Sequence, residues 1–180
     1  MEPQGISEEA LFRRMAGGEA YAFETLYARL ERPLMTLCAA ILTRRDLAEE
    51  AMQEAWMELL RARHRWTQVR SPRAYLFQIA RREALSLRGK EAGFAVPASD
   101  VLPLVEAEAG ADDQTLARRE AMEAALRKLP EAQREVVVMK HLSGLTLAEA
   151  AEIIGENPKT VESRYAAGMA RLREYLGEAS

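Results

Sequence analysis

Two predicted helix starts and one tight turn fall within residues 144–165, GLTLAEAAEIIGENPKTVESRY, and no other stretch constrains the fold as much. Thr146 and Glu149 have the spacing of a capping box, in which each side chain accepts a hydrogen bond from the other residue's backbone N–H. Gly155 can take the left-handed conformation that ends a helix, and the Asn-Pro pair after it is typical of a new helix start. The segment therefore predicts two short helices that cross steeply, as in a helix-turn-helix.

Apolar residues recur at helical spacing in both predicted helices. The stripe of the first helix consists of Leu147, Ala150, Ala151 and Ile154, and that of the second of Val161, Tyr165, Met169 and Leu172. The second helix then points another set outward, namely Lys159, Thr160, Ser163, Arg164 and Ala167. By themselves these residues fit two interpretations, a motif that reads DNA and a plain helical corner.

Composition favours an all-α fold. The chain has 180 residues, of which 48% are hydrophobic and 29% charged, and its abundant Ala, Leu, Glu and Arg are good helix formers. That length suffices for one large or two small domains. The N-terminus has no basic stretch followed by an apolar core, and no apolar run reaches the ~20 residues of a membrane helix. We therefore expect a soluble, cytoplasmic protein that does not insert into a membrane.

Cysteine and histidine are too scarce for a disulfide framework or a zinc site. The single cysteine, Cys38, lies in the apolar run LMTLCAAIL and is expected to be a buried core thiol. His64 and His141 are far apart in the sequence, which argues against a zinc site of the Cys/His type. We expect no metal, no cofactor and no catalytic residue.

The net charge of −3 is unevenly distributed along the chain. Residues 1–88 carry fourteen Arg against twelve acids, residues 89–117 one Lys against six acids, and residues 118–180 ten charges of each sign. The acidic middle also holds Gly and Pro residues that interrupt helical periodicity. We therefore predict two small helical domains, 1–88 and 118–180, joined by a flexible acidic linker over 89–117.

Positive charge is concentrated in residues 61–88, where eight arginines stand against one acid and Trp66, Tyr75 and Phe77 lie among them. Arginine binds phosphate and exposed rings stack on bases, the combination that single-stranded nucleic acid binding requires. A Ser-Pro pair at positions 71 and 72 predicts the start of a helix. Its apolar stripe consists of Leu76, Ile79, Ala80, Ala84 and Leu87. A solvated basic face, with Trp66 and Tyr75 in the core, fits the composition as well.

The preceding stretch, DLAEEAMQEAWMELLRA, predicts a strong helix with a broad apolar face and an acidic polar face. Glu50, Glu54 and Glu58 follow one another at intervals of four residues and could hold a divalent metal, as in all-helical nucleotide pyrophosphatases. A metal-dependent nucleotide hydrolase is therefore an enzymatic alternative. It lacks ligand partners, because there is no second acidic helix and no histidine ligand nearby.

Four blocks in the right order resemble the small two-domain form of the extracytoplasmic-function (ECF) sigma factors of bacterial RNA polymerase, in the sigma-70 family. AGGEAYAFETLYARL (residues 16–30) resembles the opening helix of that family, and AEEAMQEAWMELLRA (48–62) its polymerase-binding helix. SPRAYLFQIARREAL (71–85) resembles the helix at the minus-ten promoter element, and residues 125–176 resemble the domain that reads the minus-thirty-five element.

The resemblance implies a non-catalytic subunit that binds core RNA polymerase, recognises promoter DNA and has an anti-sigma protein as a second partner. It implies a polymerase contact at Glu49, Glu50, Gln53, Glu54 and Trp56. It implies minus-ten contacts at Arg65, Trp66, Arg70, Arg73, Gln78, Arg81 and Arg82, where Trp66 and the loop through Arg70 would hold a base flipped out of the duplex. It implies minus-thirty-five contacts at Lys159, Thr160, Ser163 and Arg164.

Net charge favours a DNA-binding role that depends on the polymerase. A chain at −3 gains little free energy from counterion release, and Glu162 stands where the family usually has a basic residue. We therefore expect feeble DNA binding by the chain alone, and two weak domains that act together once mounted on polymerase. The alternative is a stand-alone helix-turn-helix regulator, which would more naturally be basic and dimeric. For the linker, the resemblance implies a path through the polymerase's template and RNA-exit channel, whereas a disordered tether fits the composition as well.

Overall fold

The computed structural model describes residues 5–69, 71–91, 101–106 and 109–177. Its α-helices are α1 (Glu8–Ala16), α2 (Ala20–Ile41), α3 (Arg45–Arg61), α4 (Pro72–Leu87), α5 (Asp113–Lys128), α6 (Glu131–His141), α7 (Leu147–Ile154) and α8 (Pro158–Gly177). Two short 3-10 helices, η1 (Arg63–Gln68) and η2 (Arg88–Glu91), flank α4. Within these described ranges no strand forms beyond one isolated bridge between Arg44 and Val101, and the predicted all-α fold is confirmed.

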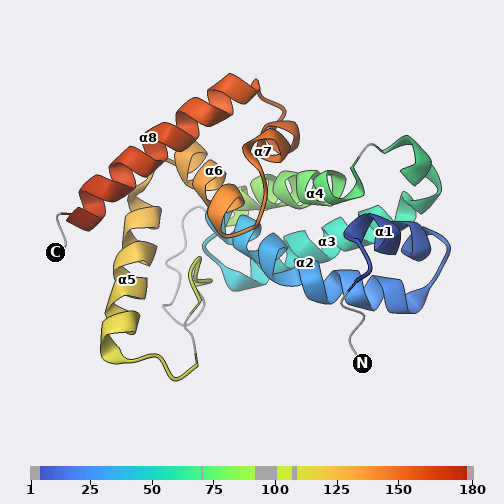
Figure 1. The fold of residues 1–180 in the computed structure, drawn as a ribbon, viewed down its shortest axis with the longest axis horizontal. Coiled ribbons are helices and arrows are strands. Elements are labelled where there is room, and N and C mark those ends of the chain that lie inside the picture. The colour runs from blue at the N-terminus through green and yellow to red at the C-terminus, as the bar shows by residue number, and fades with distance from the viewer. Residues whose placement is uncertain (1–4, 70, 92–100, 107–108, 178–180) are drawn as a thin grey trace.

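Helices α1 to α4 form the N-terminal domain, in which α2, α3 and α4 pack against one another (Figure 1). The predicted start of α4 is confirmed, because the Ser71 hydroxyl accepts a hydrogen bond from the Ala74 N–H at 3.1 Å and Pro72 occupies the first turn. The predicted apolar stripe of α4, from Leu76 to Leu87, is buried. Cys38 is also buried, as expected, and its apolar surroundings raise the pKa of the thiol to about 12.

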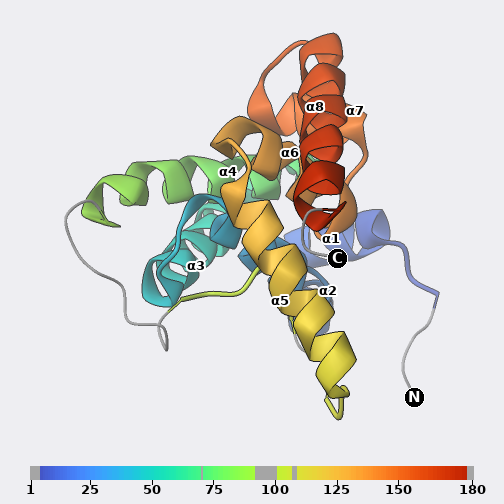
Figure 2. The same cartoon turned by 90° about the vertical axis from the view of Figure 1, so that its left-hand side faces the viewer.

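Helices α5 to α8 form the C-terminal domain, and α6 lies between α8 and the N-terminal helices (Figure 2). The predicted capping box is confirmed: the Thr146 hydroxyl accepts from the Glu149 N–H at 3.1 Å, and the Glu149 carboxylate accepts from the Thr146 N–H at 2.7 Å. Gly155 has a φ of 75°, in the left-handed region. Asn157 then caps α8 by accepting from the Lys159 N–H at 2.9 Å, so the helix-turn-helix forms as the sequence predicts.

A glycine sets the close approach of α8 to α6. A Cβ atom at Gly168 would lie 2.9 Å from Cγ2 of Val137, a distance at which the valine side chain or the backbone would have to shift. The helix of the predicted recognition residues is therefore fixed on α6 by direct backbone packing as well as by the buried side chains of Val161 and Leu172.

Part of the predicted linker packs against the folded domains. Leu102 and Leu104 are buried, the Leu102 N–H donates to the Thr43 carbonyl at 3.0 Å, and Glu123 of α5 accepts from the Leu104 N–H at 2.8 Å. The acidic composition hid this behaviour, since the apolar residues among the acids supply the burial that holds residues 101–106 in place. Helix α5 also begins at Asp113, so the last five residues of the predicted linker are helical, and residues 92–100 lie outside the described ranges.

One guanidinium ties this segment to both domains. Arg127 of α5 donates to the carbonyl of Ala39 at 2.8 Å, to the carbonyl of Leu102 at 2.7 Å and to the carboxylate of Glu123 at 3.1 Å. Beside it, Arg134 of α6 donates to the carbonyl of Ala40 at 2.8 Å. The last carbonyls of α2 have no partner within their own helix, and the C-terminal domain provides two arginines for them.

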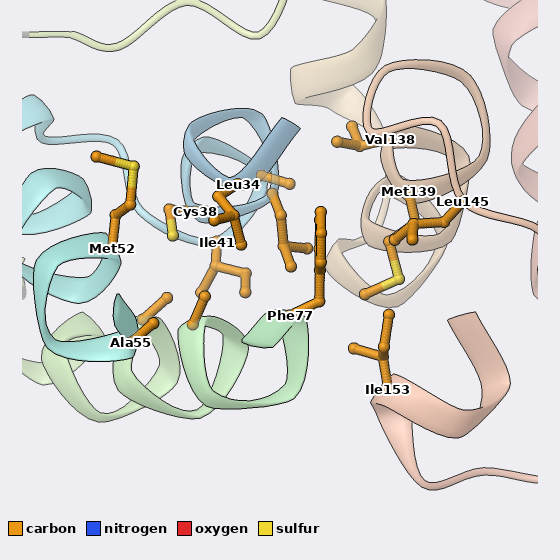
Figure 3. Close-up of a cluster of buried hydrophobic side chains, with 14 of the residues drawn as sticks. Leu34, Cys38, Ile41, Met52, Ala55, Phe77, Val138, Met139, Leu145 and Ile153 are labelled. Atoms are coloured by element: carbon orange, nitrogen blue, oxygen red, sulfur yellow. The ribbon is translucent and has the colours of Figure 1, made fainter. Parts of the chain in front are cut away.

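The hydrophobic core runs through both domains without interruption. In Figure 3, Phe77 of α4 lies between Leu34 and Ile41 on one side and Met139 and Ile153 on the other. Phe77 and Met139 are fully buried. Ile153 is buried although it lies outside the predicted stripe of α7, because α7 packs against α4 as well as against its own domain.

Candidate nucleic-acid and partner interfaces

The acidic face of α3 is largely exposed. Glu49, Glu50 and Gln53 are exposed and Glu54 is half-buried. Glu50 pairs with Lys90 at 3.2 Å and Glu54 with Arg61 at 2.7 Å, both with exposed side chains. Such surface pairs stabilise a fold by roughly 0–1 kcal/mol, so these carboxylates can exchange their cations for those of a partner at little cost.

Trp56 corrects the prediction for this face. Its side chain is only 3% exposed and packs against Phe23 and Tyr27, with ring centroids 5.6 and 5.4 Å away. The apolar stripe of α3 carries the indole inward, so Trp56 positions the helix and does not belong to the surface that a partner meets.

Met57, the residue after Trp56, lies on the exposed acidic face of α3. Its side chain is 49% exposed and lines a shallow hollow of about 160 Å³ together with Gln53, Glu54 and Glu83. Sequence reasoning missed this residue because apolar positions of a helix are usually assigned to its core. The signal was its spacing, since Glu50, Gln53, Glu54 and Met57 follow the helical repeat of one face.

A wider groove of about 640 Å³ runs along the other side of this face, between α2, α3 and the packed part of the linker. Its walls include Tyr27 and Met35 of α2, Met52 and Gln53 of α3, and Leu102 of the linker. Glu31, Glu49 and Glu106 line the groove together with Arg32, Arg45 and Arg119, so it offers apolar walls and charges of both signs to a partner.

The structure does not support the metal-site alternative. No group of three or more His, Cys, Asp and Glu side chains that could hold a metal ion exists among the residues whose placement is described. Glu50, Glu54 and Glu58 instead face Lys90, Arg61 and Arg82, one cation each. Carboxylates neutralised by separate cations do not form a shared ligand set.

The predicted minus-ten residues of α4 divide into two groups. Arg82 is exposed and binds Glu58 and Glu83, and these two carboxylates raise the pKa of its guanidinium further. Arg73, Gln78 and Arg81 are half-buried and all bond to the C-terminal domain. Their contacts there come from Ser143, Gly144, Glu135 and Glu152.

The other predicted minus-ten residues lie in η1 or just after it. Arg65 is exposed, in a segment that was expected as a loop and forms a 3-10 helix. The side chain of Trp66 and the whole of Arg70 lie outside the described residues. Phe77 is not a stacking surface, because its ring is fully buried, and Tyr75 is partly buried against the core.

The predicted recognition residues lie at the start of α8. Lys159 and Ser163 are exposed, and Thr160 and Arg164 are half-buried. Arg164 pairs with Glu156 of the turn at 3.0 Å, which holds its guanidinium near the N-terminus of the helix. The partly buried Tyr165 stacks on His141 of α6 and its hydroxyl lies 2.9 Å from Nε2 of that histidine. The exposed side chains thus stand on a helix that is anchored on its inner side.

Comparison with known proteins identifies the class of protein to which this fold and these faces belong. The family model of sigma-70 region 2 matches residues 26–93, and that of sigma-70 region 4 matches residues 119–172. The chain is 30% identical over 185 residues to the ECF RNA polymerase sigma factor SigK of Mycobacterium ulcerans, an alignment that covers 97% of each protein. It is 29% identical over 172 residues to SigM of Mycobacterium tuberculosis, which covers 95% of this chain and 85% of SigM.

Solved structures share the fold. CnrH in complex with the cytosolic domain of CnrY superposes with a TM-score of 0.69 at 24% identity, covering 96% of this chain and 99% of CnrH. The sigma factor RpoE of Bartonella quintana, solved with the anti-sigma factor NepR, gives a TM-score of 0.66 at 24% identity and covers 86% of this chain and 96% of RpoE. The chain belongs to the ECF sigma factors of the sigma-70 family. Among its described helices, none is both long and apolar enough to cross a membrane.

Proposed function

We propose that this sigma factor binds core RNA polymerase through the acidic face of α3, contacts the minus-ten element with η1 and α4, and reads the minus-thirty-five element with the start of α8. The observation that carries the proposal is the match of regions 2 and 4, in order, to the two domains that hold these faces. The domain division into residues 1–88, 89–117 and 118–180 is part of the proposal. The chain itself makes no covalent bond, since RNA synthesis belongs to the polymerase.

Charge supports a division of labour with the polymerase. Exposed carboxylates on α3 meet basic residues of a protein partner favourably and repel DNA, whereas a chain with a net charge of −3 gains little from phosphate contacts alone. Mounting both domains on one large partner raises their effective concentration at the promoter. We propose that the chain acts in the cytoplasm, where this polymerase transcribes the chromosome.

An anti-sigma protein is proposed as the second partner. CnrH and RpoE, which share the fold of this chain, were each solved with a bound protein, the cytosolic domain of CnrY and the anti-sigma factor NepR. On this chain, the groove between α2, α3 and the linker offers apolar walls beside the polymerase-binding carboxylates. A protein seated there would compete directly with the polymerase.

The experiment that tests the proposal combines co-elution with transcript mapping. The purified chain should co-elute with core polymerase on size exclusion, and the complex should start transcripts at defined positions on genomic DNA. Glu50→Lys should weaken the complex by about tenfold or more, because it turns an exposed carboxylate towards a basic partner into a like charge. Glu174→Lys, which reverses an exposed charge on α8, is the matched control.

Two results would contradict the proposal. One is a chain that never associates with core polymerase in the absence of any inhibitor. The other is tight, sequence-specific binding of duplex DNA at physiological salt without polymerase, which would favour the stand-alone regulator.

A further inference from the structure

The first half of α8 presents one exposed stripe of side chains. Lys159, Glu162, Ser163 and Ala166 are exposed, and their spacing of three, four and seven residues from the first places them on one face of the helix. Val161 and Gly168 are buried on the opposite side. Figure 1 shows α8 along the outer edge of the C-terminal domain, with α6 on its inner side. The stripe therefore faces away from the rest of the domain.

Glu162 is the acidic member of this stripe, and the fold does not use its carboxylate. Among the described residues, that carboxylate takes part in no ion pair and no hydrogen bond. Two other carboxylates of the helix-turn-helix do have partners, because Glu149 accepts from the Thr146 N–H at 2.7 Å and Glu156 pairs with Arg164 at 3.0 Å. The Glu162 carboxylate is thus left available for a donor outside the chain.

The arginines closest to the stripe are engaged within the C-terminal domain. Arg164 is held by Glu156, and Arg171 donates from Nη1 to Oε1 of Gln133 on α6 at 3.2 Å. The stripe itself carries one positive and one negative side chain, Lys159 and Glu162. A face with balanced charge gains little from counterion release, so contacts with base edges have to supply its selectivity.

The chemistry of a carboxylate limits which bases Glu162 can recognise. An ionised carboxylate accepts hydrogen bonds and donates none. In the major groove it finds donors on two bases, the N4 amine of cytosine and the N6 amine of adenine. The adenine amine stands beside the acceptor N7, which repels a carboxylate oxygen, whereas guanine and thymine present acceptors only. Cytosine is therefore the base that this side chain fits best.

The helix backbone beneath the stripe is fixed, which limits how many base pairs Glu162 can reach. The Tyr165 hydroxyl lies 2.9 Å from Nε2 of His141 on α6, and Gly168 packs directly against Val137. Ala166, one turn after Glu162, has a methyl group that can contact a thymine methyl and has no group for a hydrogen bond. On such an anchored helix, Glu162 is the acceptor of the stripe and reads one position.

We infer that Glu162 is a specificity-determining residue of α8, whose carboxylate accepts a hydrogen bond from the N4 amine of one cytosine in the minus-thirty-five element. The inference rests on the proposed function of α8. A base pair without this amine leaves the carboxylate dehydrated and opposite other acceptors, so the promoter should be used about tenfold less. Repulsion by the neighbouring phosphates adds to the loss, because nothing then compensates the negative charge.

The test uses the complex of the full chain with core polymerase. The templates share one mapped start site, carry random bases at the minus-thirty-five element, and have a barcode in the transcribed part that identifies each template. Sequencing the transcripts gives the relative use of the four bases at each position. The wild-type complex should favour cytosine over guanine and thymine by about tenfold at one position.

Glu162→Gln is the diagnostic variant, because it keeps the size of the side chain and places an N–H donor beside the oxygen. Glutamine fits N6 and N7 of adenine, so the ratio of cytosine to adenine at that position should fall by about tenfold, with the other positions unchanged. Glu174→Gln, the same change of charge at an exposed site further along α8, is the matched control and should keep the wild-type preference.

The outcomes separate the inference from the proposed function. Specific transcripts without a cytosine preference in the wild type, or the same preferences in Glu162→Gln as in the wild type, would overturn the inference and leave the proposed function intact. A wild-type chain that never binds core polymerase would overturn both.

A second variant distinguishes base reading from support of the helix. Glu162→Ala removes the acceptor and should abolish the cytosine preference at the one position, while templates with other bases there are used at least as well as by the wild type. A uniform loss on all templates in both Glu162→Gln and Glu162→Ala would assign Glu162 a structural role and contradict the inference.

Discussion

Helices α4 and α8 both carry proposed DNA contacts, yet their surroundings are opposite. Arg73, Gln78 and Arg81 of α4 are bonded to the other domain, whereas Lys159 and Ser163 of α8 remain exposed. The difference follows from the apolar residues. Helix α4 buries Phe77 in addition to its predicted stripe, which gives it a second apolar face, while α8 buries little beyond one stripe. The second apolar face of α4 thus accounts for the domain that covers it.

Among the substitutions that test the difference between α4 and α8, removal of the Phe77 ring should change the free energy of unfolding most. Phe77→Ala is expected to lower the free energy of unfolding by about 3–5 kcal/mol, because the ring fills space between both domains. Urea denaturation would measure the change. Tyr21→Ala, which removes an aromatic ring that is 45% exposed, should cost far less, and equal losses at the two positions would show that the interdomain core is not shared as described.

A methyl group at Gly168 tests the anchoring of the open helix. Gly168→Ala should cost about 1–3 kcal/mol, since its Cβ would press on Val137 and force α8 away from α6. Gly177→Ala adds the same methyl at the end of α8, where no atom lies within 4 Å, and should change stability by less than about 0.5 kcal/mol. Thermal unfolding of both variants gives the comparison, and a stabilised Gly168→Ala variant would contradict the close packing.

The proposed minus-thirty-five face at the start of α8 can be tested on the polymerase complex. Arg164→Ala should weaken promoter binding by about 1–3 kcal/mol if its guanidinium leaves Glu156 for a base or a phosphate. Filter binding or start-site transcription at several promoters would measure this loss. Arg173→Ala, an exposed change further along α8, should have little effect, and unchanged transcription from every promoter with Arg164→Ala would assign that arginine a structural role only.

The helix caps of α7 and α4 should give the smallest differences. Thr146→Ala removes the hydroxyl that accepts from the Glu149 N–H and donates to the Glu149 carboxylate, and Ser71→Ala removes the hydroxyl that accepts from the Ala74 N–H. Each should cost about 1 kcal/mol, with the larger loss at Thr146. Denaturant midpoints measured side by side would rank them. Thr146→Ser keeps the hydroxyl and should recover most of the loss; failure to recover would mean that the methyl group of Thr146, not its cap, is what stabilises α7.

Local signals explain what the sequence predicted correctly. The capping box at Thr146, the left-handed Gly155 and the Ser71 cap all depend on residues within a few positions of one another. Their structures follow from those positions alone, and all three form as expected. The apolar stripe of α4 was equally readable because it repeats along one helix.

Interactions across the domain boundary explain what was missed. Glu135 is buried because it meets Arg81, a residue 54 positions away in the sequence, and nothing near Glu135 distinguishes it from a surface glutamate. Trp56 looked like a partner contact, although α2 contributes the two rings that bury it. Leu102 and Leu104 were hidden in the same way by their acidic neighbours, and their burial required the end of α2 and α5 to come together.

The three hydrogen bonds of Arg127 couple the C-terminal domain to the packed part of the linker. This single side chain donates hydrogen bonds to the end of α2, to the backbone of residue 102 and to Glu123 of its own helix. Moving the C-terminal domain away from α2 would therefore also break its hydrogen bond to residue 102. Displacing residues 101–106 would in turn remove one of the contacts that hold Arg127 in place. A ligand that displaces either the C-terminal domain or residues 101–106 would therefore loosen the other as well.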